Sequence, residues 1–124
     1  MQRVLAFVDG LAEKSGVAAE TGSRLDLALE EWVTNLCRHA YGQAGGTIEV
    51  AVCAGDGTFV VEITDAGPEF DPTTKPDPDV GASLAERQPG GVGLLLIRRM
   101  VDEVRYRREG TRNVLSLSVA APHS

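Results

Sequence analysis

The spacing of the hydrophobic residues changes along the chain, and this change constrains the fold more than any other feature. In residues 1–15 and 23–41 apolar residues recur at three- and four-residue steps, which predicts two amphipathic helices. From 47 to 64 they alternate with their neighbours, which predicts two strands joined by a turn at Gly55-Asp56-Gly57. Amphipathic helices and hairpin-paired strands must bury their apolar faces against each other, so two layers are expected.

The second half of the chain begins with a long segment that has no hydrophobic period. Residues 66–91 contain five prolines and four glycines, and an aperiodic loop of this length is usually functional or disordered. A helix is expected over 93–102, followed by strands over 103–108 and 112–119 with a turn at Glu109-Gly110. The predicted fold class is therefore α+β, an α/β two-layer sandwich with a mixed, mostly antiparallel sheet and helices packed on one face.

Composition excludes several functional classes. The 124 residues suit one domain, and a net charge of -6 argues against a nucleic-acid-binding protein, which needs a basic face. No apolar run approaches the ~20 residues of a membrane span, and the start lacks a secretory signal, so a soluble cytoplasmic protein is expected. Cys37 and Cys53 are expected to be reduced, partly buried thiols, and His39 and His123 are too few for a histidine-based zinc site.

Three polar residues share one edge of the second predicted helix. At 100° per residue, Glu31, Asn35 and Arg38 fall within about 60° of arc, away from the apolar stripe. The carboxylate could accept a proton, the amide oxygen could bind Mg²⁺, and the guanidinium could face a phosphate. A solvated polar face with an i, i+4 pair is the alternative explanation.

A carboxylate ends the second predicted strand on its apolar side. Asp65 keeps the phase of Phe59, Val61 and Ile63, and a carboxylate facing a core needs a partner. It could accept a hydrogen bond from an exocyclic amine such as that of adenine, while Gly67 would let another group approach the backbone closely. Alternatively, Asp65 caps the turn at the end of the strand.

Glycines precede the third predicted helix. The sequence Gly90-Gly91-Val92-Gly93 would expose backbone N–H groups at the positive end of that helix, which suits a phosphate. Such a turn can also be purely structural. A P-loop is excluded because GxxxxGK[ST] is absent, and the Rossmann pattern is excluded because the glycines do not follow the first strand.

Taken in order, these segments resemble one family. Glu31-x-x-x-Asn35 within LALEEWVTNLCRHAY resembles the N box of the Bergerat-fold ATPases. DAGPEFDP, from Asp65, resembles the first glycine box as anti-sigma-factor serine kinases have it, and GVGLLLIRRMVDEV, from Gly91, resembles the second. The resemblance covers nearly the whole chain and implies a histidine-kinase-like ATPase domain over 1–124, with 66–91 as the ATP lid. The family's usual strand before the first helix is expected to be missing, because the chain starts at or just before that helix.

The resemblance also implies roles for individual residues. Glu31 would be the catalytic base, Asn35 would ligate Mg²⁺, Asp65 would bind the adenine amine, and Gly91 and Gly93 would frame the lid near the phosphates. The implied ATP-binding residues are Asn35, Arg38, Asp65, Gly67, Phe70, Gly91, Val92, Gly93, Leu94 and Thr111, with Asn113 as an alternative to Thr111. His39 is interpreted as structural.

The function that the resemblance implies is an ATP- and Mg²⁺-dependent protein serine kinase. Its substrate would be a STAS-type anti-anti-sigma protein, and it would sequester a sigma factor by partner switching, without contacting nucleic acid or membrane; a homodimer is also implied. Two alternatives stay open. One is a binding module that holds ATP without turnover. The other is the detached ATP domain of a sensor histidine kinase, which is less favoured because neither His39 nor His123 is placed as a phosphoacceptor.

Overall fold

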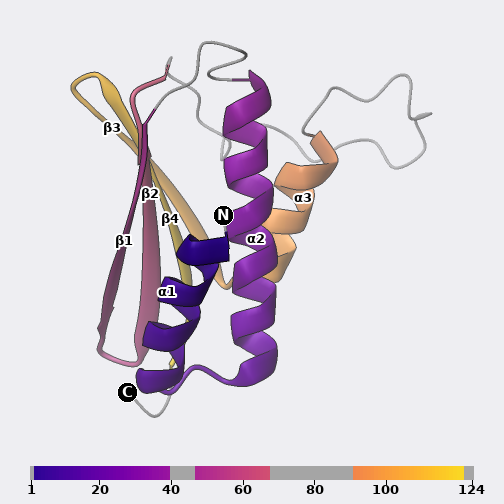
Figure 1. Cartoon of the computed structure of the whole chain (residues 1–124), viewed down its shortest axis with the longest axis vertical. Helices are drawn as coiled ribbons and strands as arrows, with labels where there is room; N and C mark the ends of the chain where they lie inside the picture. The colour runs from indigo at the N-terminus through magenta and orange to yellow at the C-terminus, as the bar shows by residue number, and fades with distance from the viewer. Residues whose placement is uncertain (1, 40–46, 68–90, 122–124) are drawn as a thin grey trace.

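The computed structural model describes residues 2–39, 47–67 and 91–121, with only the backbone for 38, 39 and 91–94. Its elements follow the expected order of two helices, two strands, one helix and two strands (Figure 1). They are α1 (Gln2–Lys14), α2 (Ala19–His39), β1 (Ile48–Gly55), β2 (Thr58–Asp65), α3 (Gly91–Met100), β3 (Glu103–Glu109) and β4 (Arg112–Ala120).

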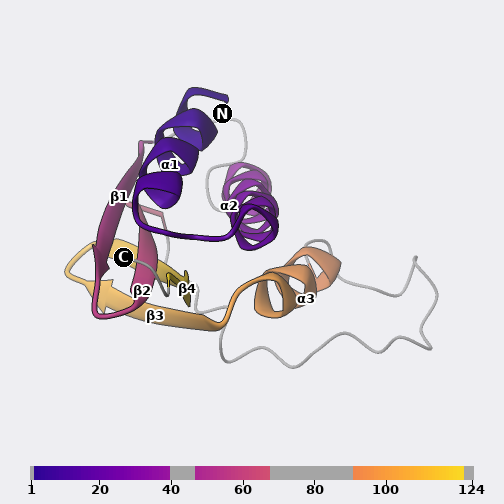
Figure 2. The same cartoon turned by 90° about the horizontal axis from the view of Figure 1, so that it is seen from below.

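The four described strands form one antiparallel sheet in the order β1-β2-β4-β3. All three helices lie on one side of this curved sheet, which Figure 2 shows from below. The predicted two-layer α/β arrangement is therefore confirmed. In the register, Asp65 at the end of β2 pairs with Ile48 on one side and with Asn113 on the other.

The hydrophobic core lies between the helices and the inner face of the sheet. The predicted apolar stripe of α2 supplies much of it, and Trp32 is only 1% exposed. Burying each such aliphatic or aromatic side chain contributes roughly 1.5–3 kcal/mol. The largest buried apolar side chains are Trp32, Phe59, Leu25, Leu29, Ile63, Ile97, Leu115, Leu117, Val8, Val61 and Val119.

Two tight turns set the strand register. Asp56 and Gly57 have φ values of 55° and 77°, as a two-residue hairpin of type I′ requires, so the predicted first turn is confirmed. The second turn was predicted one residue too early. Because Glu109 still pairs with Arg112, the turn consists of Gly110-Thr111, where Gly110 adopts a φ of 58°.

The predicted bounds of two helices were wrong. Helix α2 begins at Ala19 rather than at 23. The hydrophobic spacing did not reveal its first turn, because that turn is polar and carries an exposed Glu20–Arg24 ion pair. Helix α3 spans Gly91–Met100 rather than 93–102. It ends early because the Asp102 N–H already donates to the Ser118 carbonyl, which ties the backbone to β4.

The cysteine prediction was half right. Both Cys37 and Cys53 are free thiols, but both are exposed, so the expectation of partial burial was wrong. Cys53 lies in the phase of β1 opposite to its half-buried residues Val50 and Val52, on the sheet face that no described helix covers. No helix within the described residues has the length and apolar character needed to cross a membrane.

Two carboxyl groups meet where α1 packs on α2. Partial burial, a hydrogen bond with Asp9 and the nearby charges of Asp9 and Glu30 raise the pKa of Asp26 from 3.8 to about 7. Between pH 3.8 and about 7 the folded chain therefore binds more protons at Asp26 than the unfolded chain does. Its stability falls as the pH rises through this window and is lowest above pH 7.

We expect Asp26→Asn to stabilise the fold at pH 8 and to have little effect at pH 4. The gain at pH 8 should be about 1 kcal/mol, well below the full value of the shift, because water screens a carboxyl group this exposed. Urea unfolding at both pH values measures it, and Asp9→Asn should give a smaller gain, because the burial of Asp26, the largest cause of the raised pKa, remains. An equal gain at both pH values would contradict this account.

Candidate functional site

The site begins with the inward-facing carboxylate of Asp65. Its side chain is 2% exposed and lies on the same face as Phe59, Val61 and Ile63, as the strand phase predicted. Oδ1 accepts the N–H of Gly67 at 2.9 Å, so Asp65 does cap the turn at the end of β2. The cap uses Oδ1 and leaves Oδ2 of the carboxylate outside this hydrogen bond.

A hydrogen-bond network from β3 and β4 surrounds Asp65. Asn113 donates through Nδ2 to Asp65 Oδ1 at 3.1 Å and to the Gly67 carbonyl at 3.3 Å. Its Oδ1 accepts the Tyr106 hydroxyl at 2.6 Å and Arg108 Nη1 at 3.0 Å. The same Arg108 nitrogen donates to the Gly67 carbonyl at 2.8 Å. The network fixes the carboxylate and the backbone that follows it.

The second oxygen of Asp65 is left without a donor. Oδ2 is buried and has no hydrogen-bond partner within the described part of the chain. A buried acceptor in this state costs roughly 1–3 kcal/mol. A ligand that presents an N–H group to Oδ2 would recover that cost.

Helix α2 supplies a second buried acceptor of this kind. The Asn35 side chain is 7% exposed, and its Oδ1 is buried without a hydrogen-bond partner among the residues described. A merely solvated polar face is therefore excluded for Asn35. Glu31, one turn earlier, is half-buried. The backbone of Arg38 continues the helix, but its side chain lies outside the described residues.

The elements that carry these residues end on the same side of the molecule. The end of β2, the C-terminal end of α2 and the first turn of α3 all lie toward the top of Figure 1, and α2 contacts α3. The backbone of Gly91, Val92, Gly93 and Leu94 forms that first turn, where helical N–H groups have no intrahelical acceptor. Phe70 and most of segment 66–91 lie outside the described residues.

Of the two candidates on the last hairpin, only Asn113 is seen to contact Asp65. Thr111 is exposed in the turn, whereas Asn113 is 2% exposed and pairs with Asp65 in the sheet register. Sequence reasoning missed Tyr106 and Arg108. Their phase was a usable signal, since on β3 they alternate with the exposed Arg105 and Arg107.

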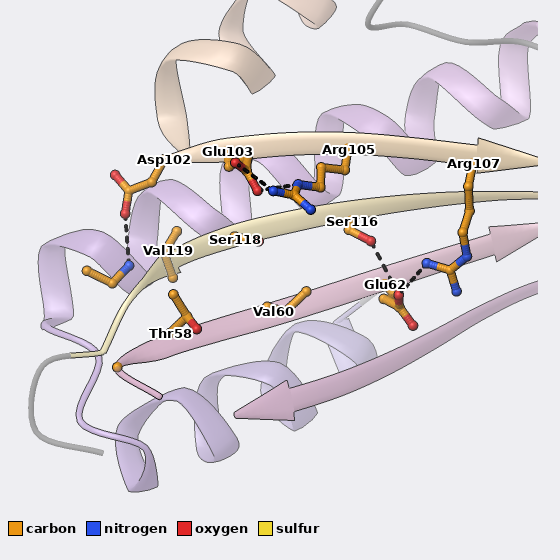
Figure 3. A pocket seen from close by; sticks show the side chains of 12 residues that line it. Thr58, Val60, Glu62, Asp102, Glu103, Arg105, Arg107, Ser116, Ser118 and Val119 are labelled. Carbon is orange, nitrogen blue, oxygen red and sulfur yellow. Dashed lines mark hydrogen bonds and ion pairs between the residues drawn. The ribbon is translucent and has the colours of Figure 1, made fainter. Parts of the chain in front are cut away.

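A hollow lies on the face of the sheet that the described helices leave uncovered (Figure 3). It has a volume of about 660 Å³, and no predicted site residue lines it. Its charged groups already have partners: Arg107 contacts Glu62 at 2.8 Å, and Asp102 accepts the Ala120 N–H. A small hollow of about 40 Å³ reaches Asp65 beside Glu49 and Arg112, too small for a nucleotide.

The described residues contain no group of three or more His, Cys, Asp or Glu side chains that could hold a metal ion by themselves. In nucleotide sites the phosphates supply many of the oxygens that hold Mg²⁺. The unpartnered amide oxygen of Asn35 fits such an arrangement, because Mg²⁺ in nucleotide sites takes one or two protein oxygens together with phosphates and water.

Comparison with known proteins agrees with this geometry. A family model described as the histidine kinase-like ATPase domain matches residues 1–119. Serine-protein kinase RsbW of Listeria monocytogenes is 31% identical over 115 residues, which cover 88% of this chain and 73% of the relative. Serine/threonine-protein kinase BtrW of Bordetella bronchiseptica is 29% identical over 122 residues, which cover 97% and 86%.

A solved structure supports the fold independently. The histidine kinase AdeS of Acinetobacter baumannii matches with a TM-score of 0.54 at 14% identity. The match covers 81% of this chain and 47% of that one, so the chain spans about half the length of the solved kinase. The shared fold confirms the predicted architecture.

Proposed function

The chain belongs to the histidine kinase-like ATPase domain family, and from this premise we propose that it is an ATP-dependent protein serine kinase with an anti-sigma regulatory role. Relatives named as serine-protein kinases support the activity. The anti-sigma role rests on the form of the DAGPEFDP segment. We propose that residues 1–124 form one ATPase domain with 66–91 as its lid.

The observation that carries the proposal is the buried, unpartnered Oδ2 of Asp65. In the proposed complex this oxygen accepts the exocyclic amine of adenine, and Gly67 lets the base approach the backbone. The N–H groups at the start of α3, from Gly91 to Leu94, face the phosphates, and Arg38 and Phe70 are proposed as further contacts to the nucleotide. Thr111 borders the site from the hairpin turn.

Asn35 and Glu31 serve the transfer step. Asn35 Oδ1 would hold Mg²⁺, and the metal would supply positive charge to the phosphates. Glu31 orients a serine hydroxyl and accepts its proton as the hydroxyl oxygen bonds to the γ-phosphorus and the bond to ADP breaks. One helical turn separates the two residues, so a single helix edge would hold both the proton acceptor and the proposed metal ligand.

The proposed substrate is a serine of a STAS-type anti-anti-sigma protein, and the proposed second partner is a sigma factor. Partner switching requires that ATP- and ADP-bound states present different surfaces, a difference we assign to segment 66–91. The proposed setting is the cytoplasm, with no contact to nucleic acid or membrane, and the kinase is proposed to act as a homodimer.

Incubation with γ-labelled ATP and a panel of STAS proteins tests the kinase proposal. Label on a STAS serine is the expected result. Binding of ATP without transfer to any member would favour an ATP-dependent binding module, and label on a histidine of this chain would favour a histidine kinase domain.

We expect Asn35→Ala to weaken the binding of Mg-ATP by about 10-fold, because the metal loses its protein ligand. With EDTA present, wild type and variant should bind ATP equally. Asn35→Asp, which restores an oxygen ligand, should recover most of the affinity. Calorimetric titration measures all of these affinities, and an equal loss with and without Mg²⁺ would remove Asn35 from the metal site.

A further inference from the structure

The orientation of the Asn113 amide is decided by its neighbours. Arg108 can only donate hydrogen bonds, so the Asn113 atom that lies 3.0 Å from Arg108 Nη1 must be the amide oxygen. The Tyr106 hydroxyl, 2.6 Å from the same oxygen, then donates as well. The NH₂ group of Asn113 is thereby turned toward Asp65.

This orientation makes the two oxygens of Asp65 unequal. Oδ1 accepts from both Asn113 Nδ2 and the Gly67 N–H, which together use its two lone pairs. Oδ2 is left as the acceptor without a partner among the described residues, and its position is fixed because Oδ1 is held from two sides. A carboxylate without these donors could rotate about its terminal bond and offer either oxygen.

We infer that Tyr106, Arg108 and Asn113 form a clamp that positions Asp65 Oδ2 for the exocyclic amine of the adenine base. The inference rests on the proposed nucleotide site and deepens it. The three side chains are positioning residues: they act on the base through Asp65. Arg108 adds a second function, because its bond to the Gly67 carbonyl ties the start of segment 66–91 to the β3–β4 hairpin.

The clamp has a specific consequence for the choice of base. Adenine presents an N–H donor to Oδ2, whereas hypoxanthine presents a carbonyl oxygen at the same position, and two acceptors repel each other. A rigid, buried acceptor rejects such an analogue strongly, because nothing else can satisfy it. A carboxylate free to turn away discriminates less. Preference for ATP over ITP therefore measures the clamp.

The test compares the dissociation constants of Mg-ATP and Mg-ITP for wild type, Tyr106→Phe and Arg108→Gln. Wild type should prefer ATP by about 10-fold or more. Each variant should bind ATP about 3- to 10-fold more weakly, the range for one lost hydrogen bond, and bind ITP almost unchanged. Tyr106→Phe removes a single hydroxyl, and thermal melting without nucleotide checks that both variants fold.

Arg105→Gln is the matched control. Arg105 lies on the same strand but on the opposite face of the sheet, paired with Glu103, so its replacement should leave both affinities unchanged. Variants that keep the wild-type preference for ATP would overturn the clamp and leave the kinase proposal standing. A wild-type protein that binds ATP and ITP equally would overturn the role of Oδ2, and one that binds neither would overturn both proposals.

Discussion

Replacing Asp65 with asparagine is expected to weaken ATP binding by about 100-fold, the largest effect on affinity that the account predicts. Oδ1 accepts two hydrogen bonds, from Gly67 and Asn113, so the new amide must keep its oxygen on that side. Its NH₂ group then occupies the place of Oδ2 and meets the adenine amine donor to donor. Losing a charge-assisted bond and burying an unpaired donor costs about 3 kcal/mol.

Calorimetric titration with Mg-ATP measures this loss. The matched control is Asp56→Asn, an exposed turn residue in the left-handed region that asparagine tolerates, and it should bind ATP as wild type does. Because Asp65→Asn is nearly isosteric, its melting temperature shows whether the fold survives. A well-folded Asp65→Asn variant with wild-type affinity would remove Asp65 from the nucleotide site.

Glu31→Ala should reduce phosphoryl transfer by about 10²- to 10⁴-fold and change ATP affinity by no more than about threefold. A general base acts in the transfer step, so its loss lowers the rate and not the binding of the nucleotide. Single-turnover transfer of labelled phosphate to the STAS partner, at saturating ATP, isolates that step.

Glu30→Ala provides the control for this experiment. Glu30 is the neighbouring residue of α2, and its side chain is exposed. A change there should leave transfer unchanged. If Glu31→Ala transferred phosphate at the wild-type rate, another group would have to accept the serine proton.

Alternation within β2 was enough to predict that Asp65 faces the core, because side chains of a strand alternate strictly between two faces. The choice between Thr111 and Asn113 could not be made in this way. It depends on the register between β2 and β4, which pairs Asp65 with Asn113 across 48 positions of the chain. Long-range register of this kind has no local signal.

The contribution of β3 could be predicted only in part. Alternation along the strand gives the phase of Tyr106 and Arg108, but the two residues gain a role only where β3 packs beside β4 and the start of segment 66–91. On α2 the spacing placed Asn35 on the polar edge of the helix. Its burial arises in the folded chain, where α2 contacts both β4 and α3, so a local pattern could not distinguish a buried amide from a solvated one.

The nucleotide site itself is tested most directly by thermal melting of the wild-type protein with Mg-ATP and with Mg-ADP. At 100 times its dissociation constant, a nucleotide that binds only the folded chain adds about 2.7 kcal/mol, which for a domain of this size raises the melting temperature by on the order of 10 °C. We expect this rise with both nucleotides. An unchanged melting temperature with millimolar amounts of either one would contradict it.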